Sequence, residues 1–145
     1  MEITAAGVGL TLGALNTNVA YSNTRFDNLG SSAGPNPLHY AGTATFNNVE
    51  VNLQYQITPS LLSGIAYDYT RNGGAGGREG ADYHLFSAGL DWFLSKRTDL
   101  YTIAVYEKAS GIDSSGSQAV AQITGLTPSS TDRQFALRVG IRHKF

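Results

Sequence analysis

Hydrophobic and polar residues alternate with a period of two along most of the chain. In the last segment, FALRVGIRHKF at 135–145, the odd positions carry Phe, Leu, Val, Ile and Phe and are interrupted only by His143. The even positions carry Ala, Arg, Gly, Arg and Lys. Because successive side chains of an extended strand point to opposite faces, this pattern predicts a strand with one apolar face and one cationic face. A helix would mix the two sets around its circumference.

Sorting the rest of the chain by parity predicts seven strands and no helix. The predicted strands cover residues 3–12, 17–26, 46–57, 61–71, 82–94, 99–109 and 132–145. Short turns at 13–16, 58–60 and 95–98 alternate with long polar connections at about 27–45, 72–81 and 110–131. We therefore expect an all-β, antiparallel, up-and-down sheet that forms a single domain over residues 1–145.

The alternation alone does not decide whether the apolar face meets a second protein layer or lipid. Two features favour lipid. All the short turns fall at one end of the sheet and all the long connections at the other, as in outer-membrane β-barrels. The predicted strands also run for about ten residues or more, the length that crosses a bilayer at a tilt, whereas strands of globular proteins average about 5–6 residues. The sequence therefore predicts a transmembrane β-barrel.

Aromatic residues on the predicted apolar faces gather near strand ends. Barrels carry such residues as girdles at the two membrane interfaces. The predicted girdle residues are Tyr67, Tyr69, Trp92 and Tyr101.

Composition narrows the classes of function. Charged residues make up 14% of the chain and the net charge is −1, so there is no general attraction to nucleic acid. The chain has no cysteine, which excludes disulfides and thiolate metal sites. Mean hydropathy is −0.16 and no apolar run is long enough for a spanning helix, as alternating barrel strands would produce. The opening MEITAAGVGL lacks the basic start of a secretory signal, so we expect a mature form or an internal piece.

The sequence gives little support for an enzyme or for a protein that binds a cofactor or a metal. NGGAGGREG, at 72–80, lacks the Lys-Ser/Thr of a phosphate loop and no helix pattern follows it, which favours an external loop. The histidines His39, His84 and His143 show no metal-ligand spacing. His84 and Ser87 fall on opposite faces of one predicted strand, which argues against a base and nucleophile pair. We expect no enzyme activity, no metal and no cofactor.

Several stretches resemble a known family. YDYTRNGG, DWFLSKRTDLY, ITGLTPSSTDRQ and RVGIRHKF closely resemble the C-terminal part of Gram-negative general porins, the trimeric 16-stranded outer-membrane channels, especially the β-proteobacterial type. The resemblance runs from about Thr45 to Phe145. It implies the bacterial outer membrane, contact with its lipid, a homotrimer, and passive diffusion of small hydrophilic solutes and ions. In that family the terminal Phe, here Phe145, belongs to the signal that the outer-membrane assembly machinery reads.

The resemblance also implies roles for charges on the polar faces. In the family a basic cluster faces acidic residues on an inward-folded loop, and Arg138 and Arg142 are candidates for that cluster. Pairing with neighbouring acids is the alternative role for both. Lys144 would lie near the periplasmic mouth and Lys108 toward the outer end of its strand. The predicted pore-lining residues are Arg138, Arg142, Lys144, Lys108, Glu50, Asp68 and Asp91.

Seven strands do not match a single-chain bacterial barrel, which has an even number. By analogy with the family we expect the last seven strands of sixteen, with Met1 outside the cell. One alternative is a small closed barrel that acts as an anchor or adhesin, whose eighth strand would have to come from LHYAGTATF at 38–46. Another alternative, a soluble β-sandwich binding module, fits the strand lengths less well.

Overall fold

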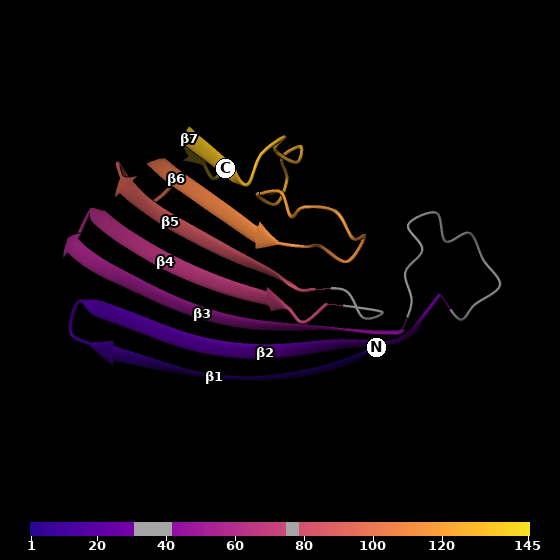
Figure 1. Ribbon diagram of the computed structural model, residues 1–145. Coiled ribbons are helices and arrows are strands. Elements are labelled where there is room, and N and C mark those ends of the chain that lie inside the picture. The colour runs from indigo at the N-terminus through magenta and orange to yellow at the C-terminus, as the bar shows by residue number, and fades with distance from the viewer. Residues whose placement is uncertain (31–41, 75–78) are drawn as a thin grey trace.

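The computed structural model describes residues 1–30, 42–74 and 79–145 of the 145-residue chain. It is all-β: seven antiparallel strands form one curved sheet in the order β1 to β7, so each strand pairs with its neighbours in sequence (Figure 1). Among the described residues, no helix has the length and hydropathy needed to span a membrane. The strands are β1 (Glu2–Leu12), β2 (Leu15–Leu29), β3 (Gly42–Thr58), β4 (Leu61–Asn72), β5 (Ala81–Phe93), β6 (Thr98–Gly111) and β7 (Arg133–His143).

All seven predicted strands are present; β2 and β3 extend farthest beyond their predicted bounds, and β7 ends at His143 instead of residue 145. The second begins at Leu15 instead of residue 17 and ends at Leu29, and the third begins at Gly42 instead of residue 46. The extra residues are mostly polar, and the ladder extends through them because backbone hydrogen bonds do not require an apolar side chain. Of the segment considered for an eighth strand, 42–46 belongs to β3 and 38–41 lies outside the described residues.

The two ends of the sheet are built differently (Figure 1). At one end, which we call the turn end, β1–β2, β3–β4 and β5–β6 are joined by two to four residues. Gly13 has a φ of 60°, which a residue without a Cβ adopts without strain, and it closes the first turn. Ser95 Oγ accepts hydrogen bonds from the N–H groups of Arg97 and Thr98, each 3.1 Å long, and fixes the third. The opposite end, the long-loop end, carries the connections after β2, β4 and β6.

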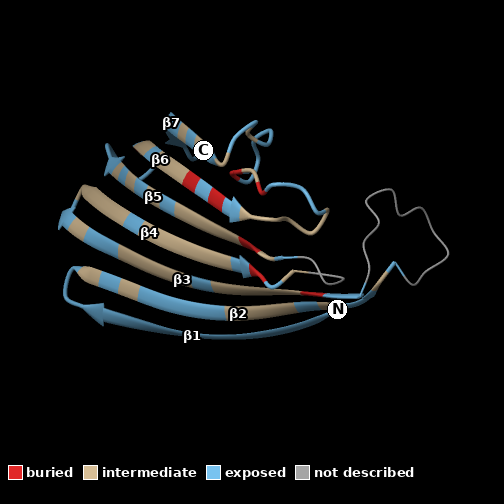
Figure 2. Cartoon of the chain, viewed as in Figure 1, coloured by how far each residue is buried: buried red, intermediate tan, exposed pale blue. Residues whose placement is uncertain are grey.

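Few residues of the sheet are buried, and the rest are intermediate or exposed (Figure 2). Val139 is 73% exposed, Phe135 64% and Trp92 54%. A soluble sheet would cover such side chains with a second layer, since each buried large apolar side chain stabilises a fold by about 1.5–3 kcal/mol. The apolar face of this sheet has no such layer among the described residues, and a lipid environment accounts for that exposure.

The sheet is also open at both sides. Within the described residues β1 is hydrogen-bonded only to β2, and β7 only to β6. The structure is therefore a curved wall with two unpaired edges. A closed barrel has no such edges.

Candidate functional site: the polar face of the sheet

Strand register identifies which residues share a face. Directly opposed residues on neighbouring strands point the same way. Arg142 on β7 lies opposite Asp99 on β6, and Tyr101 on β6 lies between Gly140 on β7 and Asp91 on β5. These residues therefore belong to one face, which we call the polar face. Its members among the predicted pore-lining residues are Glu50, Asp68, Asp91, Arg138 and Arg142.

The register corrects two predictions on β6. Tyr101 lies on the polar face between the arginine-bearing strand and Asp91, so it is not a girdle residue. Lys108 lies opposite His84 and Arg133, on the other face, and so does not line the polar wall. The pattern is ambiguous because both faces of β6 carry apolar residues, with Ile103 and Val105 on one face and Leu100 and Tyr106 on the other. Pairing with β5 and β7 decides the matter, and sequence alternation within one strand does not.

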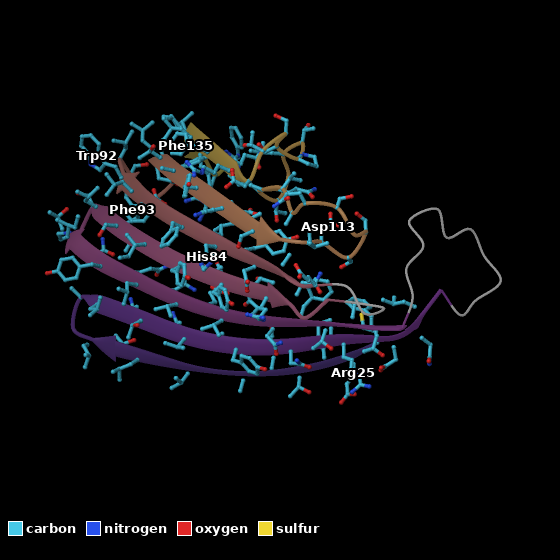
Figure 3. The ribbon with its side chains drawn as sticks, in the orientation of Figure 1. Arg25, His84, Trp92, Phe93, Asp113 and Phe135 are labelled. Carbon is cyan, nitrogen blue, oxygen red and sulfur yellow. The ribbon has the colours of Figure 1, made fainter. Side chains whose placement is uncertain are left out.

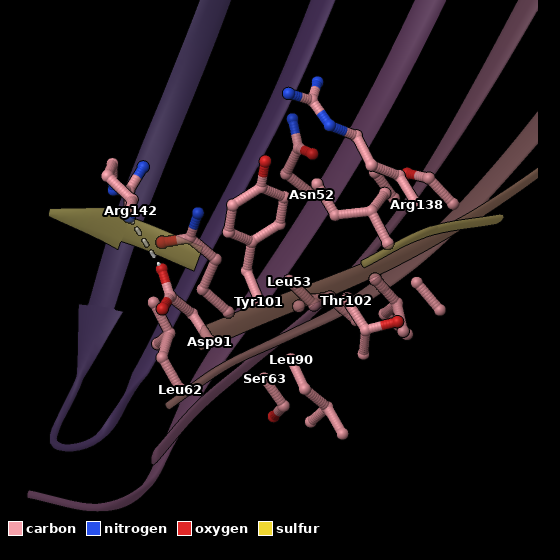
Figure 4. Close-up of a pocket in the computed structure, with 18 of the residues that line it drawn as sticks. Asn52, Leu53, Leu62, Ser63, Leu90, Asp91, Tyr101, Thr102, Arg138 and Arg142 are labelled. Atoms are coloured by element: carbon pink, nitrogen blue, oxygen red, sulfur yellow. Dashed lines mark hydrogen bonds and ion pairs between the residues drawn. The ribbon is translucent and has the colours of Figure 1, made fainter. Parts of the chain in front are cut away.

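Arg142 bridges two carboxylates from neighbouring strands. Its Nη2 lies 3.0 Å from Asp91 Oδ2 (Figure 4). The same Nη2 lies 2.7 Å from Asp99 Oδ2, and Arg142 Nε donates a 3.0 Å hydrogen bond to Asp99 Oδ1. Asp99 is only 5% exposed. The planar guanidinium suits this geometry because its donors form a fixed fork. One positive charge therefore compensates two negative charges, and Arg142 makes the acid pairing that was the alternative role for it.

Arg138 has a different environment. It forms no ion pair with any described residue, and its Cζ lies 5.5 Å from the centroid of the Tyr101 ring. Arg142 Cζ lies 6.0 Å from the same ring, so the ring lies between two guanidinium groups at cation–π distance. Gly140 makes room for the ring, because a Cβ at Gly140 would lie 2.5 Å from Tyr101 Oη.

An acidic pair lies farther along the polar face. Glu50 on β3 is directly opposite Asp68 on β4, and neither carboxylate forms an ion pair with a described residue. Glu50 accepts a hydrogen bond from Asn52 Nδ2. Strands are about 4.8 Å apart, so Asp68 on β4 lies three strand spacings, or about 14 Å, across the sheet from β7. The register places it level with Gln134, four residues before Arg138. The polar wall is therefore acidic on one side and carries an unpaired cation on the other.

The remaining predicted pore-lining residue, Lys144, follows the end of β7. Its backbone N–H donates a 2.9 Å hydrogen bond to Arg97 O, which ties the chain end to the β5–β6 turn. Together with Lys96 and Arg97 it lines a hollow of about 400 Å³ at the turn end. A larger open groove of about 790 Å³ follows the sheet and is bordered by Asp91, Tyr101, Arg138 and Arg142.

The opposite face, which we call the apolar face, carries an aromatic row near the long-loop end. One member of this row, Tyr67, is among the predicted girdle residues. Tyr67 and Phe86 pack with ring centroids 4.6 Å apart. Tyr69 lies next to Tyr67 along β4, and Trp92 lies near the turn end of β5 (Figure 3). Across β4 to β7 the row consists of Tyr67, Phe86, Tyr106 and Phe135.

The spacing of polar residues on the apolar face matches a bilayer. The cations Lys108 and Arg133 lie opposite each other at one end, and His143 lies opposite Thr98 at the other. Arg133 and His143 are ten positions apart. That separation corresponds to about 33 Å along a strand, and to about 25 Å along the membrane normal if the strand is tilted by about 40°. The apolar band of outer-membrane barrels is about 25 Å tall.

The two described histidines, His84 and His143, are paired with hydroxyl groups. The described residues contain no group of His, Cys, Asp and Glu arranged to hold a metal ion. His84 Nδ1 lies 2.8 Å from Tyr67 Oη, and His143 Nδ1 lies 2.8 Å from Thr98 Oγ1. Ser87 points to the face opposite His84, and His39 lies outside the described residues.

Taken together, a single antiparallel up-and-down sheet with a lipid-compatible face and a charged polar face defines the wall of a transmembrane β-barrel. The model of the Gram-negative porin family matches residues 1–112, so the chain belongs to that family and lies in the bacterial outer membrane, in contact with its lipid. The match includes β1 and β2, which precede the stretch where the resemblance was strongest, and does not extend to β7.

A solved structure supports the same fold. The chain is similar to the outer-membrane expressed OmpT of Vibrio cholerae, with a TM-score of 0.69 and 16% sequence identity. The similarity covers 97% of this chain and 40% of that one, so this chain spans well under half of its length. No curated protein matches the sequence.

Proposed function

We propose that the protein is a porin through which small hydrophilic solutes and ions diffuse passively, with the polar face of the sheet forming part of a water-filled pore. The observation that carries this proposal is the division of one sheet into a face of exposed Val, Leu, Ile and aromatic residues and a face of charged and amide residues. Permeation of this kind breaks no bond. Pore width and wall charge then determine which solutes pass.

We propose further that the working barrel has sixteen strands and is trimeric, of the β-proteobacterial type. The open edges of β1 and β7 support additional strands, because each unpaired backbone group in hydrocarbon costs several kcal/mol. The seven strands correspond to 40% of the Vibrio cholerae chain. If strands are evenly spread, that ratio suits a barrel of roughly sixteen to eighteen strands.

Arg138 is our principal candidate for charge selectivity. Its guanidinium has no carboxylate partner among the described residues, so its charge is available to a passing anion. Arg142 contributes less because Asp91 and Asp99 compensate it. Glu50 and Asp68 supply the opposing acidic side of the same wall.

Phe145 is proposed as the assembly signal. Its side chain is fully exposed, and its ring packs edge-on against His143 with centroids 5.0 Å apart. Both rings therefore lie at the turn end of β7, where an assembly partner could reach them.

Reconstitution into planar bilayers tests the proposal. The protein purified from outer membranes should give stable ohmic steps of conductance on the order of a nanosiemens, as wide aqueous pores do. Protein that is inserted but electrically silent would contradict the channel and would favour the membrane-anchor alternative. Permeation rates that differ strongly between solutes of the same size would also contradict simple diffusion.

A further inference from the structure

The connection between β6 and β7, residues 112–131, leaves the end of β6 and doubles back toward β7 (Figure 1). Its contacts place it over the polar face. It begins as a small hairpin in which Ile112 pairs with Gln118. The segment that follows is among the few buried parts of the molecule, with Ala119 at 1% and Ala121 at 0% exposure (Figure 2).

The buried part of this connection packs on polar-face residues. Ala119 clusters with Ala81 on β5 and Ala109 on β6, and Tyr83 packs against the cluster. Continuous register places the three strand residues, Ala81, Tyr83 and Ala109, on the same face as Asp91. The loop therefore covers the pore side of β5 and β6 near the long-loop end.

Polar side chains of the wall hold the loop backbone in place on β6 and β7. The carboxylate of Glu107 on β6 is 6% exposed and accepts a 3.1 Å hydrogen bond from the N–H of Gln122. Gln134 on β7 accepts a 2.7 Å hydrogen bond from the N–H of Ile123, and its Nε2 donates a 2.8 Å bond to Thr127 O. Each bond satisfies a loop backbone group that would otherwise be desolvated without a partner.

A third attachment extends the coverage to β4. Asn72 is 1% exposed, and its Nδ2 donates a 2.7 Å hydrogen bond to Ser114 Oγ, 42 residues away in sequence. The loop thus contacts the polar face of four adjacent strands, a width of about 14 Å at 4.8 Å per strand spacing. A layer packed on a sheet lies about 10 Å from it, so the loop removes a comparable depth from the pore on this side.

The loop is almost uncharged. Asp113 is the single charged residue between 112 and 131, and it lies in the hairpin beyond the end of β6 (Figure 3). An obstruction of this composition limits solutes by size and not by charge.

We propose that residues 112–131 form a fixed constriction at the long-loop end of the pore and set the upper size limit of permeating solutes, with Glu107, Gln134 and Asn72 as the positioning residues. This inference rests on the proposed porin function and adds a determinant of size that is separate from the charge determinant at Arg138.

Thiol labelling in outer-membrane vesicles tests the position of the loop without requiring conduction. The chain has no native cysteine, so Ala121→Cys introduces a unique thiol. We expect this thiol to react with a maleimide many times more slowly than that of Ser130→Cys, an exposed control in the same connection. Adding Glu107→Ala and Gln134→Ala should accelerate labelling at position 121 and leave position 130 unchanged. Equal labelling at both positions without the two alanine substitutions would overturn the covered loop.

Liposome swelling tests the size limit. Glu107→Ala with Gln134→Ala should raise the permeation of a trisaccharide relative to a monosaccharide several-fold. Its reversal potential in a salt gradient should match that of Glu107→Gln, which removes the same charge. Glu107→Gln keeps an acceptor oxygen and should retain the original ratio. If the alanine pair prevents assembly, a chain in which a short Gly-Ser turn replaces 113–130 provides the same test with every strand intact.

The outcomes separate the two proposals. An unchanged sugar ratio in the loop-shortened protein, with normal conductance, would overturn the constriction and leave the porin function standing. Failure of the unmodified protein to admit any sugar or ion would overturn the porin function, and with it the constriction.

Discussion

Two pairs of carboxylates occupy the polar face of the sheet and are stabilised in different ways. Asp91 and Asp99 share one guanidinium, that of Arg142, with contacts of 3.0 and 2.7 Å. Glu50 and Asp68 lie directly opposite each other across β3 and β4 with no cation among the described residues. Both pairs bring like charges together on neighbouring strands, an arrangement that is unfavourable in a sheet unless something compensates it.

The difference indicates which charges are available to a solute. Two like charges about 5 Å apart repel by about 1 kcal/mol in water, and by several times more where water is excluded. Asp99 is nearly buried and therefore needs its arginine. Glu50 and Asp68 are only partly buried, and water in a pore can screen their repulsion. Under the proposed porin function, the Asp91–Asp99 pair, which Arg142 compensates, contributes mainly to stability, and the open pair, Glu50 and Asp68, contributes mainly to the field in the pore.

Arg142→Ala should have the largest effect, because it leaves Asp91 and Asp99 adjacent and uncompensated. We expect a fall of several degrees in the temperature at which the folded band disappears on a heat-modifiability gel, together with a shift of reversal potential toward cations. Combining it with Asp91→Asn and Asp99→Asn should restore much of the heat stability. A heat stability equal to that of the unmodified protein would show that Arg142 does not stabilise the wall.

Glu50→Lys converts the open pair into an opposite-charge pair with Asp68. A favourable cross-strand pair contributes about 0.2–1 kcal/mol, so thermal stability should rise slightly. The reversal potential should shift toward anions, because a negative wall charge has been replaced by a positive one. Glu50→Gln, the matched control, should give about half of the shift in reversal potential. A large loss of stability would instead indicate that Glu50 has a favourable role that its visible contacts do not explain.

Arg138→Ala should change selectivity with little change in stability. The guanidinium has no ion pair among the described residues, and surface substitutions of this kind usually lie within about 0.5 kcal/mol. We expect a shift of reversal potential toward cations, and Arg138→Lys should largely preserve the original value. If selectivity does not move, Arg138 only packs on Tyr101 and has no role in selecting ions.

The smallest effect is expected at Asp113. Its carboxylate is stabilised by hydrogen bonds, and not by an arginine as at Asp99 or by water as at Glu50 and Asp68. Burial opposes the charged form, but hydrogen bonds from Ser115, Ser117 and Gly116 outweigh it and hold the pKa of Asp113 below the ordinary value of 3.8. A lowered pKa in the folded loop means that its stabilisation is complete above the ordinary value and declines as pH falls below it.

Hydrogen exchange of the hairpin at 112–118 can measure this pH dependence. Protection, corrected for intrinsic exchange, should decrease below about pH 4. Asp113→Asn should remove most of that pH dependence. Protection that rises toward acid pH would contradict the sign of the effect.

The sequence by itself determined the strands, their approximate limits and the polarity of most of their faces. Period-two alternation is a local property, so β7 with its Arg138 and Arg142 could be assigned from its own residues. The same holds for Glu50 and Asp68 on β3 and β4. The placement of short and long connections followed equally directly from the spacing of these strands.

Only the tertiary structure decided the features that depend on neighbouring strands or on contacts distant in sequence. The faces of β6 were ambiguous because both are partly apolar, and register with β5 and β7 moved Tyr101 to the polar side and Lys108 to the apolar side. Arg142 binds Asp99 and Asp91, which lie 43 and 51 positions before it in the sequence. The loop at 112–131 has the sequence of an ordinary polar connection, and its position over the polar face depends on side chains from four strands that only pairing brings together.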